Sequence, residues 1–381
     1  MRRNDIPGQD ELKEVFTRMV DQEKLPHAML IHGVEGGVSL PLALFLTSYL
    51  MCDSPEGGDI CGTCPSCSKT RHFTHPDVHF VVPVNGTKTI RKELANTDRF
   101  IEDWREALIA NPFLSLRDWY ERIGIERSQG FIGDREGKEF RQKLSLRSYE
   151  GKAKVFIIWH ADRMNPTFGN KILKNLEEPS ERTHFIVVTE QPAQLLTTIL
   201  SRTQRFKEEH ISDESLAAFL EHTYDVTAER AMNLAFRAEG NVHSATKEAQ
   251  ENDDPWLAEF REWMRLCYKK DLVGLFQWSE KMAKNNRDAQ RQFVSGALKM
   301  LDRCFRMGWV ETPIPMEGEE ASFYKGFAPF INASNVRQFM DLLEEASFHV
   351  ERNVNEKLVW YDSSIKAVRF MHAGKKAAER V

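Results

Sequence analysis

The sequence lacks the long apolar runs that membrane proteins need. Its longest apolar stretch, Leu40 to Met51, is too short and too interrupted to span a bilayer. The opening residues "MRRNDIPGQDE" contain no apolar signal core, so we do not expect secretion. Strong charge of one sign is missing as well, because a net charge of −5 creates no whole-molecule field that attracts nucleic acid. We therefore expect a cytoplasmic protein with no membrane partner.

Cysteine is scarce except in one short segment. Only Cys267 and Cys304 stand alone. The other four follow the spacing C-x8-C-x2-C-x2-C and are Cys52, Cys61, Cys64 and Cys67. The cluster lies in a stretch too rich in glycine and proline to build its own core. This distribution favours a metal site in a reducing compartment over a disulfide framework.

The four-cysteine cluster predicts a structural zinc ion. Four thiolates complete a tetrahedral shell, and the two-residue gaps let neighbouring sulfurs reach one ion. A complete shell leaves no position for water, so we expect a structural zinc ion and not a catalytic one. His72 and His75 lie nearby, but the ligand count is already full and we do not expect them to bind. An iron–sulfur cluster and buried free thiols are the alternatives.

Apolar runs and helical patterns alternate in the first half of the chain. Four runs read as strands, "AMLIHG", "DVHFVVPV", "KVFIIW" and "THFIVVTE", and "LPLALFLTSYLM" reads as a buried helix. A further helix carries one apolar stripe made of Met164, Phe168, Ile172 and Leu176. Apolar strands that alternate with helices predict a parallel sheet covered on both faces. This pattern stops near Phe206.

After Ser212 only helical patterns remain. Ser212 and Thr227 are predicted N-caps, and Gly240 is a predicted helix end. The polar stretch "QENDDP" (250–255) reads as a linker, and the length of the chain suits two or three domains. We expect an α/β domain at 1–208, a small helical lid domain at 209–250 and a helical C-terminal domain at 255–381.

A helical insertion at about residues 85–130 interrupts the α/β pattern. One helical stripe in it consists of Ile90, Leu94, Ile101, Trp104 and Leu108. The stripe predicts either a satellite core over these helices or a surface that binds a partner. Because neither flanking strand needs this segment to pair, we expect the α/β core to fold without residues 88–122.

Residues 33–43, "GVEGGVSLPLA", have the spacing of a phosphate-binding loop that opens a helix. A working loop reads G-x-x-x-x-G-K-[ST]: backbone amides cradle phosphate, the lysine neutralises it and the hydroxyl holds magnesium. Here Val38 replaces the second glycine, and its Cβ is expected to resist close approach of the backbone to phosphate. Ser39 and Leu40 replace the reactive pair. The degenerate loop consists of Gly33, Gly36, Gly37, Val38, Ser39 and Leu40, and we expect no ATP in it.

The strand "KVFIIW" also lacks the acidic residues that a nucleotide hydrolase of this class presents to metal and water. This chain offers Trp159 and His160 at that point. Asp162 lies two positions further on, past the expected site. Two independent catalytic elements are missing, so we expect no ATP hydrolysis by this chain.

Several segments in combination resemble the bacterial clamp-loader branch of the AAA+ ATPases. They are "IPGQ" (6–9), "PHAMLIHGVEGG" (26–37), the four-cysteine module (52–67), "HPD" (75–77), "NKILKNLEEP" (170–179), "TEQPAQLLTTILSRTQRF" (189–206) and "AEGN" (238–241). The resemblance covers residues 1 to about 250. It is weaker in the C-terminal domain, where "NVNEKLVWYDSSIKAV" is similar.

The resemblance implies a place in a ring of five related subunits. Some subunits of such loaders bind ATP, and another keeps the fold but loses the nucleotide site. That subunit supplies an arginine to a neighbour's ATP site through a Ser-Arg-Cys motif, which here is Ser201, Arg202 and Thr203. Because the guanidinium is the working group, the change to threonine is expected to matter little.

The resemblance also implies partners. They are the other clamp-loader subunits (ATP-binding tau/gamma-type and delta-type), the sliding clamp, and primer–template DNA inside the assembled ring. The C-terminal domain would pack into a helical collar with the other subunits.

Two other functions stay open: an active AAA+ ATPase with a divergent loop, and a zinc-containing nucleic-acid-binding module. The segment "KEFRQKLSLRSYEGKAK" (138–154) holds six Lys/Arg against two Glu. It reads either as a contact to DNA phosphates or as a solvated helix face, and we favour the solvated face.

Overall fold

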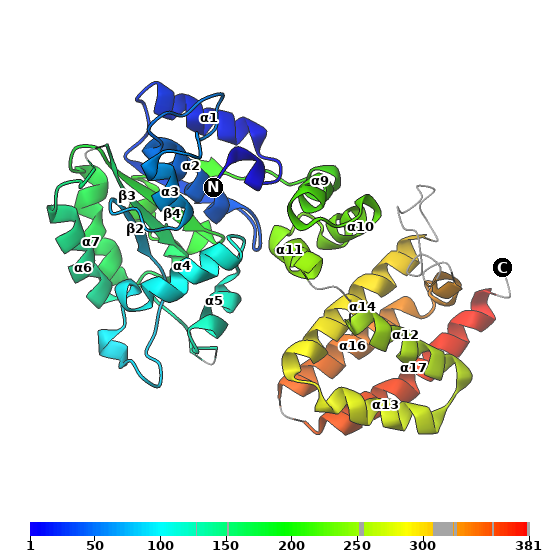
Figure 1. Cartoon of the computed structure of the whole chain (residues 1–381). Coiled ribbons are helices and arrows are strands. Elements are labelled where there is room, and N and C mark those ends of the chain that lie inside the picture. Colours follow the sequence, from blue (N-terminus) through cyan, green and yellow to red (C-terminus); the bar gives the residue numbers. More distant parts are fainter. Residues whose placement is uncertain are drawn as a thin grey trace. The chain divides into compact units, whose positions relative to one another are not determined.

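The computed structural model describes residues 1–126, 128–150, 152–250, 255–307, 323, 326–352 and 354–378 (Figure 1). It divides into two compact units, Met1–Gln250 and Glu251–Val381. Residues 251–254, most of the predicted linker, lie outside the described residues. Within the described ranges, no helix combines the length and the apolar character that crossing a membrane requires.

A five-stranded parallel sheet lies at the centre of the N-terminal unit, which confirms the predicted α/β core. The strand order is β2-β3-β4-β1-β5, and all neighbouring strands are parallel. The strands are β1 (Ala28–His32), β2 (Val78–Val81), β3 (Lys154–Trp159), β4 (Thr183–Thr189) and β5 (Gln204–Lys207). The sequence pattern missed β5, because this short edge strand buries only Phe206.

Helices cover both faces of the sheet, because successive side chains of a strand point to opposite faces. On one face, Ile31, Ile157 and Ile186 contribute to the core that includes α2 (Ser39–Met51), in which every residue except Leu50 is buried. On the other face, Phe156 and Phe185 belong to the core that includes residues of α6 and α7.

Among the residues that the structure describes, seven further helices surround the sheet together with α2 (Figure 1). They are α1 (Asp10–Asp21), α3 (Pro65–Arg71), α4 (Ile101–Ala110), α5 (Leu116–Arg122), α6 (Asp134–Ser145), α7 (Pro166–Glu177) and α8 (Thr197–Leu200). The 3-10 turns are η1 (Arg3–Asp5), η2 (Lys92–Leu94), η3 (Thr97–Phe100), η4 (Ala161–Arg163) and η5 (Pro192–Gln194). Of the predicted α7 stripe, Phe168, Ile172 and Leu176 are buried, whereas Met164 precedes the helix.

Three helices follow the sheet and complete the N-terminal unit: α9 (Asp213–Tyr224), α10 (Ala228–Ala238) and α11 (Val242–Gln250). We call them the lid helices. The Ser212 and Thr227 side chains accept backbone N–H groups at the starts of α9 and α10, as predicted. Gly240 follows the end of α10 with φ +84°, a conformation that favours glycine.

The insertion belongs to the main core, which corrects the expectation that it packs on itself or on a partner. The Trp104 ring lies 4.9 Å from the ring of Trp159 in β3 and 5.1 Å from that of Trp119. Both insertion tryptophans are fully buried, and Trp119 Nε1 donates to Pro83 O over 2.7 Å. Leu94, a member of the predicted stripe, is exposed and does not belong to this core. Deleting residues 88–122 would remove both tryptophans from this core, so we now expect the deletion to destabilise the α/β core, contrary to the expectation from sequence.

The C-terminal unit is entirely helical among its described residues, as predicted. Its elements are α12 (Pro255–Lys269), α13 (Leu272–Lys284), α14 (Arg287–Met307), η6 (Ala328–Phe330), α16 (Val336–Glu351) and α17 (Glu356–Ala378). The rings of Trp263 and Trp278 stack at 5.3 Å in its core. Trp263 Nε1 donates to Ser364 Oγ over 2.9 Å, so this buried N–H group is satisfied.

Candidate functional site

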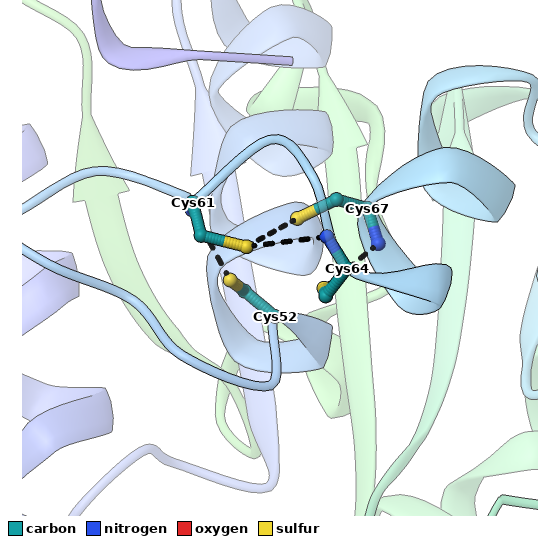
Figure 2. Close-up of side chains that lie close together, drawn as sticks. All are labelled: Cys52, Cys61, Cys64 and Cys67. Atoms are coloured by element: carbon teal, nitrogen blue, oxygen red, sulfur yellow. Dashed lines mark hydrogen bonds between the residues drawn. The ribbon is translucent and has the colours of Figure 1, made fainter.

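The four cysteines converge on one point (Figure 2). Cys52 follows the end of α2, Cys64 precedes α3 and Cys67 lies in the first turn of α3. With Cys61, their four sulfur atoms lie within 4.8 Å of one another. The Sγ atoms of Cys61 and Cys67 are 3.9 Å apart, far beyond the disulfide bond length of about 2.05 Å. The four thiols are therefore free and within reach of one common ion.

The cluster fits a tetrahedral metal ion. Two thiolates bound to zinc at about 2.3 Å lie about 3.8 Å apart, which matches the Cys61–Cys67 distance of 3.9 Å. Backbone N–H groups of Thr63 and Cys64 donate to Cys61 and lower its pKa to about 6. Burial instead raises the pKa of Cys52 and of Cys67, so metal binding would release their protons.

The nearby histidines do not join the cluster. His72 is exposed, and the buried His75 places Nε2 3.0 Å from Glu150 Oε2. Asp77 accepts the backbone N–H groups of Tyr149 and Glu150 over 2.6 and 2.8 Å. The "HPD" segment therefore fastens the loop that precedes β3. Over the part of the chain that the structure describes, the four cysteines are the single group with metal-binding spacing.

The degenerate phosphate loop, which follows β1, binds a carboxylate of its own chain. Glu208 is the first residue after β5, and its Oε1 accepts Val34 N over 3.0 Å. Its Oε2 accepts Val38 N over 3.0 Å and the Ser39 hydroxyl over 2.8 Å. Glu208 is 6% exposed. Burial raises the pKa of this carboxyl, whereas the hydrogen bonds from Ser39, Val34 and Val38 act in the opposite direction.

The Val38 Cβ does not keep a carboxylate from the loop, and its expected effect on phosphate stays a prediction. An anionic oxygen lies 3.0 Å from the Val38 amide nitrogen in spite of the side chain. The loop therefore still accepts an anion at its amides, as loops at helix N-termini commonly do. What it lacks is a lysine, a magnesium ligand and free space.

A second carboxylate lies against the same loop. Glu190 follows β4, and its Oε1 accepts Gly36 N over 3.4 Å. Gly37 N is occupied as well, because it donates to Val34 O over 3.1 Å. The cavity between the loop and the strand ends measures about 10 Å³. That volume holds roughly one water molecule, whereas ligand pockets measure about 300–1,000 Å³.

The end of β3 directs no carboxylate at the loop. Trp159 and His160 line the small cavity. Asp162 accepts the Thr189 hydroxyl over 2.6 Å, and its Oδ1 lies 3.5 Å from His160 Nδ1. This acidic side chain is thus engaged behind the cavity and is not among the residues that line it, as the sequence indicated.

Arg202 lies in the turn between α8 and β5, where its own chain holds it. One terminal nitrogen donates to Thr198 O over 2.9 Å and to Ser201 Oγ over 3.2 Å. The other guanidinium nitrogens pair with Glu177, the last residue of α7. The Arg202 side chain remains 32% exposed. Thr203 is buried and donates to Ile199 O over 3.1 Å, so it stabilises the turn itself.

Arg202 and the phosphate loop lie at opposite ends of two neighbouring parallel strands. Arg202 precedes β5, whereas Gly33 follows β1, and these two strands are parallel neighbours with His32 beside Lys207. The four residues of β5 span about 13 Å. The Arg202 guanidinium, paired with Glu177 near the ends where the strands begin, therefore lies away from the loop of its own chain.

Sequence reasoning missed Glu208 and Glu190. A signal for them was available, since both follow strands directly and parallel strands end at the same edge of a sheet. For Glu208 this signal required β5, which the pattern did not reveal, whereas Glu190 ends the predicted strand "THFIVVTE" and was overlooked. The four predicted cysteines lie together, and the loop and Arg202 lie apart; their predicted roles stay predictions.

Comparisons with known proteins relate the chain to subunits of DNA polymerase III. Residues 8–211 match the family described as DNA polymerase III, delta subunit. DNA polymerase III subunit delta' of Bacillus subtilis is 27% identical over 197 residues, which are 51% of this chain and 46% of that protein. Subunit tau of Escherichia coli is 24% identical over 246 residues, 63% of this chain and 31% of that protein. The chain thus spans less than half the length of these curated relatives.

Among solved structures, a DNA polymerase III gamma subunit-related protein of Thermotoga maritima is similar. It is 15% identical with a TM-score of 0.42, over 94% of this chain and 99% of that one. The family match covers more than half of the chain, so this protein belongs to the DNA polymerase III, delta subunit family, as a delta-prime-like member.

Proposed function

We propose that this chain is a non-hydrolysing, AAA+-type subunit of the DNA polymerase III clamp loader. It stabilises the ring and donates Arg202 to the ATP site of a neighbouring subunit. The observation that carries the proposal is the occupied phosphate loop: Glu208 binds the amides of Val34 and Val38 that a nucleotide would use. A chain whose own site is filled has no substrate in cis for an arginine.

Guanidinium suits a contact to another chain's nucleotide. It is always charged, and it binds phosphate oxygens through parallel N–H groups. In related hydrolases such an arginine contributes about 10³ to 10⁵ in rate. Arg202 retains exposed surface and lies at the edge of the sheet away from its own loop, which supports action in trans.

We infer that the four cysteines hold a structural zinc ion. Cys52, Cys61, Cys64 and Cys67 would supply the complete ligand shell and leave no position for a reacting water. The ion would link the end of α2 to α3 in a segment with little apolar core of its own. Its role is therefore stability of the module and not chemistry.

We further propose the other subunits, the sliding clamp and primer–template DNA as partners. Exposed apolar side chains on α13 and α17, among them Val273, Phe276 and Leu358, support packing of the C-terminal unit into a collar. The basic segment 138–154 gives little support for DNA contact. Of its cations, Lys143 pairs with Asp98, and Lys154 is buried against backbone carbonyls.

Equilibrium binding of ATP with magnesium to the isolated chain tests the first part. We expect none, and Ser39→Lys should not create hydrolysis, because Leu40 and the filled loop remain. Tight ATP binding by the wild-type chain would favour the active ATPase instead. Steeply salt-dependent DNA binding by the chain alone would favour a nucleic-acid-binding module.

Arg202→Ala in a reconstituted loader tests the second part. We expect the ring to assemble and DNA-stimulated ATP turnover to fall. The loss should be about 10³-fold at the affected site and smaller in the steady state, because the other ATP sites continue. Arg205→Ala, an exposed arginine of β5, is the matched control and should turn over normally. Unchanged turnover with Arg202→Ala would leave the chain as a scaffold only.

A further inference from the structure

The contact between Glu208 and the degenerate loop is built more completely than a helix cap requires. One carboxylate accepts two backbone amides and one hydroxyl, from Val34, Val38 and Ser39. A single accepted N–H group satisfies an ordinary N-cap. The carboxylate instead fills the concave side of the loop, the place where such loops bind phosphate.

We propose that Glu208 is an internal substitute for a nucleotide phosphate, a positioning residue that keeps the loop and the lid helices in one arrangement without nucleotide. The proposal rests on the proposed function, and it adds what the filled site does. The loop is not merely inactive: it is held in a phosphate-bound form by the chain itself.

The glycines of the loop fit this carboxylate closely. A Cβ on Gly33 would lie 1.8 Å from Glu208 Cδ, and a Cβ on Gly37 would lie 1.9 Å from its Oε1. Neither glycine has a positive φ, so backbone conformation does not demand glycine at either position. The need is space for the carboxylate, in the way that such loops need space for phosphate.

The chain also fixes the segment that carries Glu208. Glu208 N donates to His32 O over 2.9 Å, which extends the pairing of β5 with β1 by one residue. The Gln9 side chain then brackets the next residue: its Oε1 accepts Glu209 N over 2.9 Å and its Nε2 donates to Glu209 O over 2.5 Å. Hydrogen bonds at Glu208 and at Glu209 therefore fix the backbone that carries the carboxylate.

The loop also forms hydrogen bonds to the lid helices, at the start of α11. His243 N donates to Gly36 O over 3.0 Å, and Asn241 Nδ2 donates to Glu35 O over 3.2 Å. Asn241 Oδ1 accepts Ser244 N over 2.8 Å and so starts α11. Because Val34 and Val38 flank these carbonyls, their bonds to Glu208 fix the backbone on which α11 rests.

The insertion supplies a second support for the same helix. His243 Nδ1 lies 3.0 Å from Phe113 O, and His243 Nε2 lies 3.3 Å from Asp118 Oδ2. This support involves no residue of the loop. Loss of Glu208 should therefore loosen the loop and the start of α11 without releasing the lid helices completely.

The test compares Glu208→Ala with Glu209→Ala, a matched control whose side chain is exposed. Removing the Glu208 side chain exposes the same amides around a space shaped for an anion. We expect Glu208→Ala to unfold at lower temperature and inorganic phosphate to raise that temperature, relative to chloride at equal ionic strength. Wild type and Glu209→Ala should not respond to phosphate beyond chloride.

Hydrogen exchange gives a readout specific to positioning. In Glu208→Ala, amides 34–38 and 241–244 should exchange at least about ten-fold faster than in wild type, and phosphate should slow them again. If Glu208→Ala does not fold, Glu208→Gln keeps the volume but turns an N–H group toward amide donors. Its loop amides should also exchange faster, with no response to phosphate.

Wild-type exchange rates in either variant, or an equal phosphate effect on wild type and Glu208→Ala, would overturn the proposal. These readouts need no partner subunit and no ATP turnover. They can therefore fail while the Arg202→Ala result stands, and the reverse also holds.

Discussion

Charged side chains are arranged differently at the two ends of the parallel strands in the central sheet. Where the strands end, Glu208 and Glu190 are drawn against the phosphate loop, and the remaining cavity is about 10 Å³. Where the strands begin, Arg202 keeps 32% of its side chain exposed and pairs with Glu177 on the surface. The comparison teaches that carboxylates of the chain itself can occupy a phosphate-binding loop, while a guanidinium at the other end of the strands stays accessible at the surface.

Metal removal should produce the largest effect on stability, and it should act through α2, the helix that follows the phosphate loop. Helix α2 runs from Ser39 in the loop to Met51, beside Cys52, so the cysteine module fixes its far end. Chelation, or Cys64→Ser, should lower the unfolding temperature of the N-terminal unit by about 10 °C or more, since a structural zinc ion contributes several kcal/mol. Calorimetry with metal analysis measures both.

Purified wild-type protein should carry about one zinc ion per chain, as a complete four-thiolate shell requires. Cys267→Ala, in the C-terminal unit, is the control and should keep the metal. An iron chromophore, or wild-type protein without zinc that is as stable as before chelation, would contradict the metal assignment.

Another buried carboxylate, that of Glu136, sharpens the comparison with Glu208. Glu136 in α6 is 3% exposed and accepts the backbone N–H group of Thr97 over 2.7 Å. Burial raises the pKa of the Glu136 carboxyl. The hydrogen bonds from Thr97 and the charge of Lys143 lower this pKa by less, so that it lies at about 7. In the unfolded chain the same carboxyl ionises near pH 4.5.

The sign of the pH effect follows from that difference. Between pH 4.5 and about 7 the unfolded chain releases a proton that the folded chain keeps, so the free energy of unfolding decreases as pH rises. Glu136→Gln keeps the acceptor for Thr97 N and removes the titration. In wild type, the free energy of unfolding should decrease by about 3 kcal/mol between pH 5 and pH 8 because of Glu136, and the variant should lack this decrease. Urea unfolding at several pH values measures it. Parallel pH profiles of the variant and wild type would refute the shift.

The smallest effect is expected from substitution of Glu177, the ion-pair partner of Arg202. Glu177→Gln removes an exposed ion pair, which contributes at most about 1 kcal/mol. Arg202 keeps its bonds to Thr198 O and Ser201 Oγ. In a reconstituted loader, ATP turnover at the affected site should fall two- to five-fold, since about 1 kcal/mol corresponds to about five-fold, with the unfolding temperature unchanged.

Glu178→Gln, the exposed neighbour of Glu177, is the matched control and should have no effect. A rise in turnover with Glu177→Gln would show that Glu177 competes with the phosphate for Arg202 and does not position it.

Local patterns in the sequence predicted much of this molecule, because they depend on neighbouring residues. The spacing of Cys52 to Cys67 predicted the sulfur cluster, and apolar runs predicted four of the five strands. Residue identity at Ser39 and Leu40 was enough to exclude the usual phosphate and magnesium ligands. Side-chain chemistry and short spacing carry these inferences without knowledge of the fold.

Only the tertiary structure decided what fills the loop and what the insertion does. Glu208 lies far from Val38 in sequence, and they meet because β1 and β5 are parallel neighbours that end at one edge. Trp104 shows an apolar helical position in sequence, but its burial against Trp159 depends on how the insertion folds back over the sheet. Contacts between distant segments follow from topology, and no local pattern encodes topology.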